Sequence, residues 1–376
     1  MKYYTKIALQ HLAMGLIIPI AIIWKLQNGL TVSEAVMTES LVLLATALVD
    51  LPAGFIANAI NNKRALIVGG LLHLVGMILL FLGGSLAVFI IAAIITGAAW
   101  AFVSGADEAY LHDDYIEDKT MYKKHFSTVT IVDEAFTILG MLLASAALVF
   151  NSSLRMLFLV SSLLLAVHLL YTVFALPRSK VQLPVTHSAN IAGRFTWAII
   201  KNKEVLSIVP LMIAFAFIYE AGRPLWQPHL QEIGINIAGF GALFALFKLA
   251  SIGGSLLSRG RDFKLSDLVL VFTVMLGALL AFGLSFKAVS IVALCAYLFT
   301  ENYFRVYMST ALNKAITNNR AAVLSFGSVL RNGVGALIIA GMGVVSSVSI
   351  LLALSILVII KIPAIAYTLR TYAAAK

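Results

Sequence analysis

The sequence predicts an all-α polytopic membrane protein whose twelve transmembrane helices form two pseudo-symmetric six-helix bundles. Three observations support this fold class. Of the 376 residues, 61% are hydrophobic and 12% are charged, whereas a soluble domain has about half apolar and about a quarter charged residues. The apolar residues form continuous runs of 19 to 27 positions, long enough to cross a bilayer as helices. One long polar connection divides these runs into six and six.

Short polar breaks separate the apolar runs from one another. We interpret the runs as helices because the strands of a membrane barrel would alternate apolar and polar residues over about ten positions, and that alternation is absent. Twelve such helices leave no room for a sizeable soluble domain. The predicted spans cover residues 6–27, 34–60, 65–83, 86–112, 125–150, 153–175, 204–230, 235–258, 266–286, 288–313, 320–345 and 348–370.

Basic residues set the orientation of these spans. If the N-terminus is cytoplasmic, nineteen of the 27 Lys and Arg residues fall in the two tails and the internal junctions, and only Lys25, Arg155 and Lys287 fall in the external ones. The positive-inside rule then predicts that both termini are cytoplasmic, in a bacterial inner membrane. The net charge of +10 is therefore a topology signal, and no nucleic-acid partner is expected. We expect a monomer in the lipid bilayer.

The connection after the sixth span sets the predicted domain boundaries. It separates an N-terminal bundle (1–175) from a C-terminal bundle (204–376), with a cytoplasmic linker (176–203) between them. Residues 191–200 of the linker are amphipathic and contain Arg194 and Trp197, so this segment could lie along the lipid headgroups. A hinge with solvated basic residues explains the composition equally well, and both interpretations stay open.

Local motifs strengthen the interpretation of two repeated halves. Residues 50–64 read DLPAGFIANAINNKR, in which Gly54, Lys63 and Arg64 match the second span and following loop of the major facilitator superfamily, although Asn58 replaces that loop's aspartate. Residues 254–261 occupy the equivalent junction after the eighth span. Residues 104–114 and 320–325 resemble the fourth and eleventh spans of some bacterial members. The resemblance covers essentially the whole chain.

The resemblance implies a secondary transporter that works by rocker-switch alternating access, and no enzyme activity. No Gly-x-x-x-x-Gly-Lys-[ST] motif occurs, so ATP is not the expected energy source and no cofactor or metal site is predicted. The leading prediction is proton-coupled export of amphipathic compounds, as in bacterial drug:proton antiporter-like members, although the fifth span lacks their proline beside Gly140. The alternative is proton-coupled uptake of a small anionic or zwitterionic metabolite, with Arg305 or Arg223 binding its carboxylate. A membrane enzyme or sensor is the third hypothesis.

Charged residues at one depth suggest a gate. Asp50, the neighbours Asp133 and Glu134, Lys248 and Arg331 all lie about 13–17 Å from the predicted cytoplasmic ends of their spans. The resemblance implies that the second span packs against the eleventh and the fifth against the eighth. Asp50 would then face Arg331, and one of the two acids of the fifth span would face Lys248. These pairs either open and close with the transport cycle or are permanent, and both hypotheses stay open.

A second set of charges lies on spans expected to line a cavity. Glu301 and Arg305 are four residues apart in the tenth span, and Glu220 and Arg223 are three apart in the seventh, so the members of each pair share a helix face. Gly222, Pro224 and Pro228 interrupt the seventh span, and broken helices commonly mark transporter binding regions. Aromatic residues nearby are candidate substrate contacts, with packing as the alternative for most of them: Trp226, Tyr297, Tyr303, Trp100 and Phe102.

The remaining acids and the histidines receive simpler interpretations. A carboxylate taken out of water can exchange a proton as access alternates, and Glu301, near the midplane, is the first candidate and Glu220 the second. Asp107 and Glu108 lie close to the inner end of the fourth span, where we expect them to contact the loop of Lys63 and Arg64, with proton transfer as the alternative. We expect structural roles for three histidines without metal-ligand spacing: His11, His73 and His168.

Overall fold

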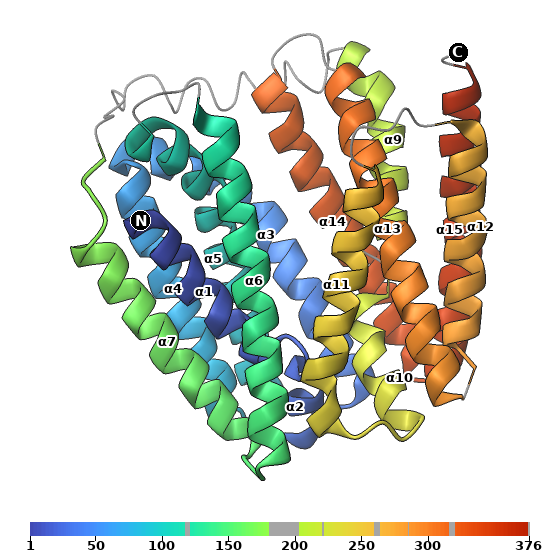
Figure 1. Ribbon diagram of the computed structural model, residues 1–376, viewed down its shortest axis with the longest axis horizontal. Helices are drawn as coiled ribbons and strands as arrows, with labels where there is room; N and C mark the ends of the chain where they lie inside the picture. The colour runs from blue at the N-terminus through green and yellow to red at the C-terminus, as the bar shows by residue number, and fades with distance from the viewer. Residues whose placement is uncertain are drawn as a thin grey trace. The chain divides into compact units, whose positions relative to one another are not determined.

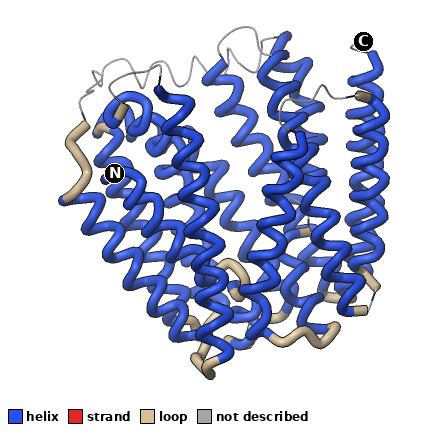
Figure 2. The backbone as a smooth tube through the Cα atoms, viewed as in Figure 1, coloured by secondary structure: helices blue, strands red, loops and turns tan. Residues whose placement is uncertain are grey.

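The computed structural model describes residues 1–116, 121–179, 203–219, 222–258, 264–284, 286–315 and 320–374. Its regular structure over these ranges is helical (Figures 1 and 2). The helices of the first half are α1 (Lys2–Ile17), α2 (Ala21–Gln27), α3 (Val32–Ile60), α4 (Asn62–Leu82), α5 (Leu86–Ala109) with a π-helical turn (Tyr110–Tyr115), α6 (Tyr122–Val149) and α7 (Leu154–Phe174).

The second half follows the same plan with one broken helix. Its elements are α9 (Lys203–Tyr219), a 3-10 turn (Arg223–Leu225), α10 (Trp226–Glu232), a 3-10 turn (Ile237–Gly239), α11 (Phe240–Ser258), α12 (Leu265–Phe282), α13 (Lys287–Ala315), α14 (Arg320–Ser346) and α15 (Ile350–Ala374). Side-chain caps fix several helix starts, as expected for Asn and Ser at this position. Asn61 accepts the amide of Arg64, and Ser85 and Ser153 cap α5 and α7.

The predicted all-α membrane fold is confirmed. Within the described ranges, nine helices are long and apolar enough to cross a membrane, and the pair α1–α2, bent by 46°, would make a tenth. The other two predicted spans are the seventh, which is broken, and the tenth. Polar residues near the middle of α13, Glu301, Asn302 and Arg305, lower its hydropathy.

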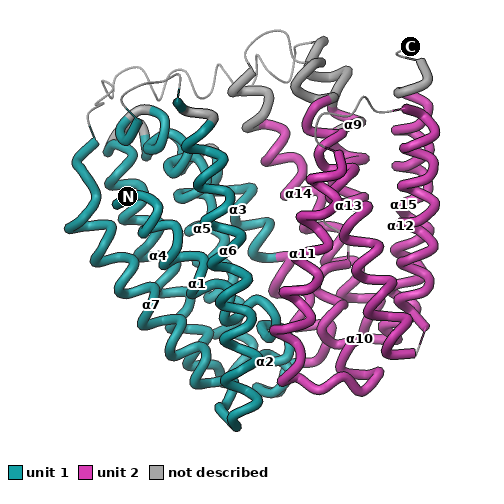
Figure 3. Tube along the Cα trace, in the orientation of Figure 1, with its two compact units in different colours: residues 1–30, 41–197 teal, residues 31–40, 198–376 magenta. Residues whose placement is uncertain are grey.

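The chain forms two compact units (Figure 3). Unit 1 consists of residues 1–30 and 41–197, and unit 2 of residues 31–40 and 198–376. In unit 1, α4 packs against α5 and α7, and α1 packs against α6 and α7. In unit 2, α12 packs against α13 and α15, and α9 packs against α14 and α15. Numbered by span, these are the same four pairings, so the packing repeats within the chain as the motifs predict.

A close approach of backbones fixes the contact between α1 and α6. A Cβ atom added to Gly140 would lie 2.5 Å from the carbonyl oxygen of Leu12, and one added to Gly15 would lie 2.4 Å from that of Thr137. Contacts this short are sterically forbidden, and the obstructing atoms belong to backbones that cannot rotate away. Glycine at both positions therefore lets the two helices meet.

We expect Gly140→Ala to lower the free energy of unfolding by about 1–3 kcal/mol, because overpacking forces α1 and α6 apart. Gly105→Ala in α5 is the matched control, since a Cβ there has no neighbour within 4 Å. The measurement is an SDS titration of each purified variant in lipid–detergent micelles. Equal midpoints for the two alanine variants would contradict the close approach.

Candidate functional site

The break in the seventh span builds the candidate site, which lies within unit 2. The helix α9 is described to Tyr219, and Gly222 has φ 106°, a left-handed conformation that favours glycine and interrupts a helix. A Cβ on Gly222 would also lie 2.4 Å from Cδ2 of Leu357. The 3-10 turn that follows begins with Arg223, so the interruption predicted from Gly222, Pro224 and Pro228 is present. Glu220, the second proton candidate, lies outside the described residues.

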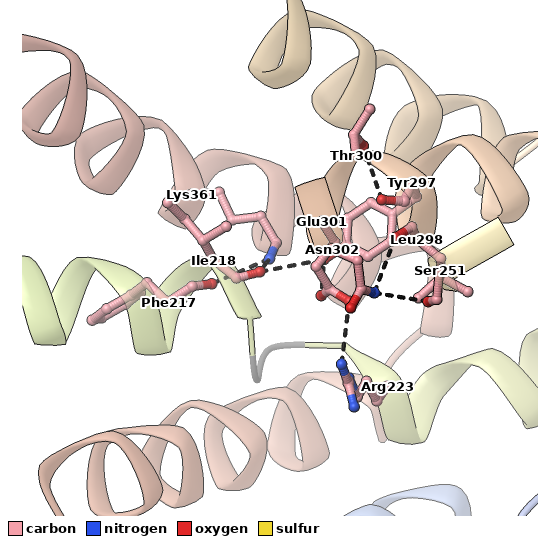
Figure 4. A network of polar contacts seen from close by, with 10 residues as sticks. All are labelled: Phe217, Ile218, Arg223, Ser251, Tyr297, Leu298, Thr300, Glu301, Asn302 and Lys361. Carbon is pink, nitrogen blue, oxygen red and sulfur yellow. Dashed lines mark hydrogen bonds and ion pairs between the residues drawn. The ribbon is translucent and has the colours of Figure 1, made fainter. Parts of the chain in front are cut away.

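Arg223 binds the carboxylate of Glu301 across the unit (Figure 4). Its Nη2 atom donates to Oε2 of Glu301 at 3.2 Å, and the hydroxyl of Tyr297 donates to Oε1 at 3.3 Å. The Glu301 side chain is 0% exposed, whereas that of Arg223 is 39% exposed. A carboxylate taken fully out of water requires such partners. The first proton candidate therefore sits in a buried pair whose basic member reaches solvent-accessible space.

The Tyr297 hydroxyl links Glu301 to the end of α9. It lies 3.3 Å from Oε1 of Glu301 and 3.4 Å from the carbonyl oxygen of Ile218. A hydroxyl has one proton to donate, so it serves one of these acceptors at a time. A change in the charge of Glu301 would therefore alter the bond that Tyr297 offers to α9.

Lys361 of α15 is a site residue for which sequence reasoning predicted no role. Its side chain is 0% exposed, and its Nζ donates to the carbonyl oxygens of Phe217, at 3.2 Å, and of Ile218. The same Nζ lies 5.5 Å from the centre of the Tyr297 ring. The last carbonyls of a helix lack intrahelical donors, so Lys361 caps α9 next to its break. Its position inside an apolar span was the available signal, but its partner carbonyls could not be deduced from sequence.

We expect Lys361→Met to loosen the end of α9. Leaving buried carbonyls without a donor costs about 1–3 kcal/mol, which corresponds to about 5- to 150-fold faster local opening. The exchange of backbone amide hydrogens for deuterium in the last turn of α9, up to Tyr219, measures this change. Lys287→Met, at an exposed lysine of α13, is the control, and unchanged exchange in Lys361→Met would show that the cap is dispensable.

Unit 1 contains a buried ion pair of its own. The Nζ of Lys6 lies 2.7 Å from both carboxylate oxygens of Asp107 and 2.9 Å from Oε1 of Gln10. Tyr3 donates to Oδ1 of Asp107 at 3.1 Å. The side chain of Lys6 is 1% exposed and that of Asp107 is 19% exposed. The carboxylate of Asp107 is thus held by α1, and its predicted contact with the loop of Lys63 and Arg64 stays a prediction.

Comparison with known proteins places the chain in a family. The family model of the Major Facilitator Superfamily matches residues 7–340, which is most of the chain. The chain belongs to this superfamily. Its fold and family together support transport across a membrane. A search of curated proteins returned no match.

Solved structures of the superfamily fold resemble the whole chain at low sequence identity. The nucleoside transporter NupG matches with a TM-score of 0.76 at 14% identity, covering 98% of each chain. A POT family transporter in complex with 5-aminolevulinic acid matches with 0.73 at 14%, covering 98% of this chain and 94% of that one. A D-xylose-proton symporter matches with 0.72 at 11%, covering 97% and 96%. At these identities the likeness shows the fold alone.

Among the residues that match the superfamily motifs, Lys63 has defined contacts in unit 1. The Nζ of Lys63 donates to the carbonyl oxygens of Val173, at 2.8 Å, and Leu176, at 2.7 Å, so it caps the end of α7. The side chains of Arg64 and Glu108 are exposed, and a Cβ added to Gly54 would have no neighbour within 4 Å. Lys63 thus has a structural contact that its motif alone did not indicate.

The aromatic candidates are packed within their own units. Trp226 (7% exposed) lies edge-on to Tyr297 (1%) with 6.2 Å between ring centres, and Tyr303 is 3% exposed. Trp100 contacts His73 with ring centres 4.7 Å apart, and Phe102 packs against the core of unit 1. Arg305 is exposed. Whether any of these side chains contacts a substrate stays a prediction.

The predicted gate residues are partly buried in their helices. They comprise Asp50 in α3, Glu134 in α6, Lys248 in α11 and Arg331 in α14, together with Asp133. Asp133 binds His11 of the same unit, with 2.6 Å between Oδ1 and Nδ1, a contact that sequence reasoning missed. The predicted pairs join residues of different units and remain a prediction.

Proposed function

We propose that this chain is a proton-coupled secondary transporter of a small organic solute and has no enzymatic activity. The observation that carries the proposal is the pair of Arg223 and Glu301, in which a fully buried carboxylate is held by a partly exposed guanidinium. Protonation of Glu301 would remove the negative charge that holds Arg223. Arg223 would then be free to change partners, and proton binding would be coupled to the state of the broken seventh span.

The geometry favours a small anionic or zwitterionic solute, taken up with protons. Arg223 keeps 39% of its side chain exposed, so a solute carboxylate can reach the guanidinium, which forms strong bonds with carboxylates. Similar folds are those of a D-xylose-proton symporter and of a POT family transporter bound to 5-aminolevulinic acid. Proton-coupled export of amphipathic compounds is the second candidate, favoured by the sequence resemblance to bacterial drug:proton antiporter-like members.

A proteoliposome experiment tests both candidates. Purified protein would be assayed for counterflow with amino acids, dipeptides, nucleosides, pentoses and cationic dyes, and then for net flux under an imposed pH gradient. Accumulation of an anionic or zwitterionic compound on the alkaline side supports uptake. Dye movement toward the acidic side supports export. Flux that ignores the gradient would remove proton coupling, and the absence of any flux would remove transport.

We further propose that Asp50 with Arg331, and Asp133 or Glu134 with Lys248, form a gate on the cytoplasmic side. The support is their shared depth in the predicted spans and the family's packing order. Asp50→Arg and Arg331→Asp are each expected to reduce transport, because each places like charges together. The double variant should recover at least part of it in the same flux assay. A double variant no better than the worse single variant would argue against direct pairing.

The proposed setting is a bacterial inner membrane, with the chain a monomer, both termini cytoplasmic and the linker 176–203 on the cytoplasmic side. The distribution of basic residues supports this orientation. Because Cys295 is the single cysteine, a Cys295→Ser variant with a new cysteine in the C-terminal tail allows a direct test. An impermeant thiol reagent that labels this cysteine in intact cells would contradict the orientation.

A further inference from the structure

Unit 1 contains a second set of titratable groups, of which only Asp133 also enters the proposed gate. His11 on α1 is bonded to Asp133 on α6, with 2.6 Å between Nδ1 and Oδ1. The hydroxyl of Thr137 donates to the same Oδ1 at 3.3 Å and lies 3.3 Å from Nδ1 of His11. The carboxylate is thus oriented by its own helix toward the imidazole.

His11 has a carboxylate partner, whereas His73 and His168, the two other histidines packed in this region, have none among the described contacts. Lys6 lies on the same helix and is neutralised by Asp107. His73 from α4 and His168 from α7 face the same interior and are each 1% exposed. Within the described part of the chain, the ring nitrogens of both have no hydrogen-bond partner. A buried imidazole without an acceptor has nothing to stabilise a positive charge, whereas His11 has a carboxylate.

The pair is also accessible. The side chains of His11 and Asp133 are 21% and 35% exposed, in contrast to the enclosed Lys6, His73 and His168. The pair is therefore not enclosed in the packed interior of unit 1.

His11 and Asp133 join α1 and α6, two helices that pack against each other and lie side by side in Figure 1. Gly15 is one turn beyond His11, and the Thr137 carbonyl meets the position of its missing Cβ at 2.4 Å. A neutral imidazole and an imidazolium differ by a full charge in their attraction to Asp133. Because α1 and α6 are closely packed here, a change in the charge of His11 would change the attraction between these two helices.

We propose that His11 and Asp133 form a second proton-binding site, in unit 1, whose occupancy changes during the transport cycle. This inference rests on the proposed function of proton-coupled transport. The ligand is a proton. It would bind Nε2 of the His11 ring, because the Nδ1–H group of that ring already donates a hydrogen bond to Asp133. Each unit would then hold one proton-binding side chain, Glu301 in unit 2 and His11 in unit 1.

The direct test is side-chain ¹⁵N NMR of the purified full-length protein labelled at its seven histidines. The His11 resonance is assigned by its loss in His11→Gln. Spectra are recorded from about pH 5 to about pH 8, and the resonance is expected to shift as the ring takes up a proton. In Asp133→Asn the imidazolium fraction should fall at the same acidic pH. A His11 resonance that does not change across this range would overturn the proposal.

The second arm measures the pH dependence of flux in proteoliposomes. His11→Gln is expected to reduce the ratio of flux at acidic and alkaline pH by about fivefold, the effect of about 1 kcal/mol of coupling. His112→Gln, at an exposed histidine of the same unit, is the control and should behave as wild type. An unchanged ratio in His11→Gln would show that the pair is not coupled to transport. If the wild type gives no flux, the proposed function fails, while the NMR arm still decides whether the pair binds a proton.

Discussion

Glu301→Gln is expected to abolish accumulation driven by a pH gradient while counterflow of the same solute persists. The amide keeps the shape of the side chain and one of the two oxygens that accept from Arg223 and Tyr297, but it cannot take up or release a proton. Loss of a coupling free energy of about 1–3 kcal/mol lowers gradient-driven accumulation by about 5- to 150-fold. Proteoliposomes loaded with the solute identified in the counterflow assay allow both quantities to be measured on one preparation.

The matched control is Glu232→Gln, which changes an exposed carboxylate at the end of α10 in the same unit. It should accumulate solute as the wild type does. Accumulation by Glu301→Gln at the wild-type level would exclude Glu301 as the coupling residue. Loss of counterflow together with accumulation would instead indicate that the buried pair is needed for structure or solute binding.

Each unit contains an ion pair between equivalent helices. In unit 1, Lys6 on the first helix pairs with Asp107 on α5, which is the fourth span. In unit 2, Arg223 on the interrupted seventh span pairs with Glu301 on α13, which is the tenth. Each half thus joins its first and fourth spans through a cation and a carboxylate. The pairs differ in exposure, since Arg223 is 39% exposed and Lys6 is 1% exposed. This difference in exposure supports the proposed role of Arg223 and Glu301 in transport and a structural role for Lys6 and Asp107.

The sequence predicted the fold well because hydrophobic length is a local property. Each span, and the break at Gly222, can be read from a window of about twenty residues. The partners of charged residues depend instead on which helix faces are turned together. Glu301 and Arg223 were singled out individually, but they were grouped with neighbours on their own helices. Their pairing across 78 positions could not be deduced from spacing.

Residues near the predicted ends of spans were the hardest to interpret. Lys6 is the first residue of the first predicted span, at its cytoplasmic end, yet its side chain lies inside unit 1. His11 was expected to be an isolated structural histidine, yet it contacts Asp133. The signal that separates a solvated lysine from a buried one is the presence of a carboxylate on a neighbouring helix. Only the packing of α1 against its neighbours supplies that information.

Asp107→Ala is expected to lower the free energy of unfolding by about 3–5 kcal/mol, because it leaves the buried ammonium of Lys6 without its carboxylate. Gln10 and its single oxygen, 2.9 Å from Nζ, cannot replace a full negative charge. The double variant Lys6→Met and Asp107→Leu should recover most of the loss, since replacing both members of a buried pair by apolar residues removes the uncompensated charge. SDS titration in lipid–detergent micelles measures all three proteins.

Glu108→Ala provides the control, because it removes an exposed carboxylate one residue further along α5. Such surface changes usually stay within about 0.5 kcal/mol of wild type. If Asp107→Ala stays within that range too, Lys6 is not held in the interior by Asp107. If Asp107→Ala is destabilised and the double variant is equally unstable, then the hydrogen bonds to Tyr3 and Gln10 stabilise unit 1 more than the ion pair does. Recovery in the double variant, with normal flux, would show that the first-half pair is structural and would leave proton coupling in that half to His11.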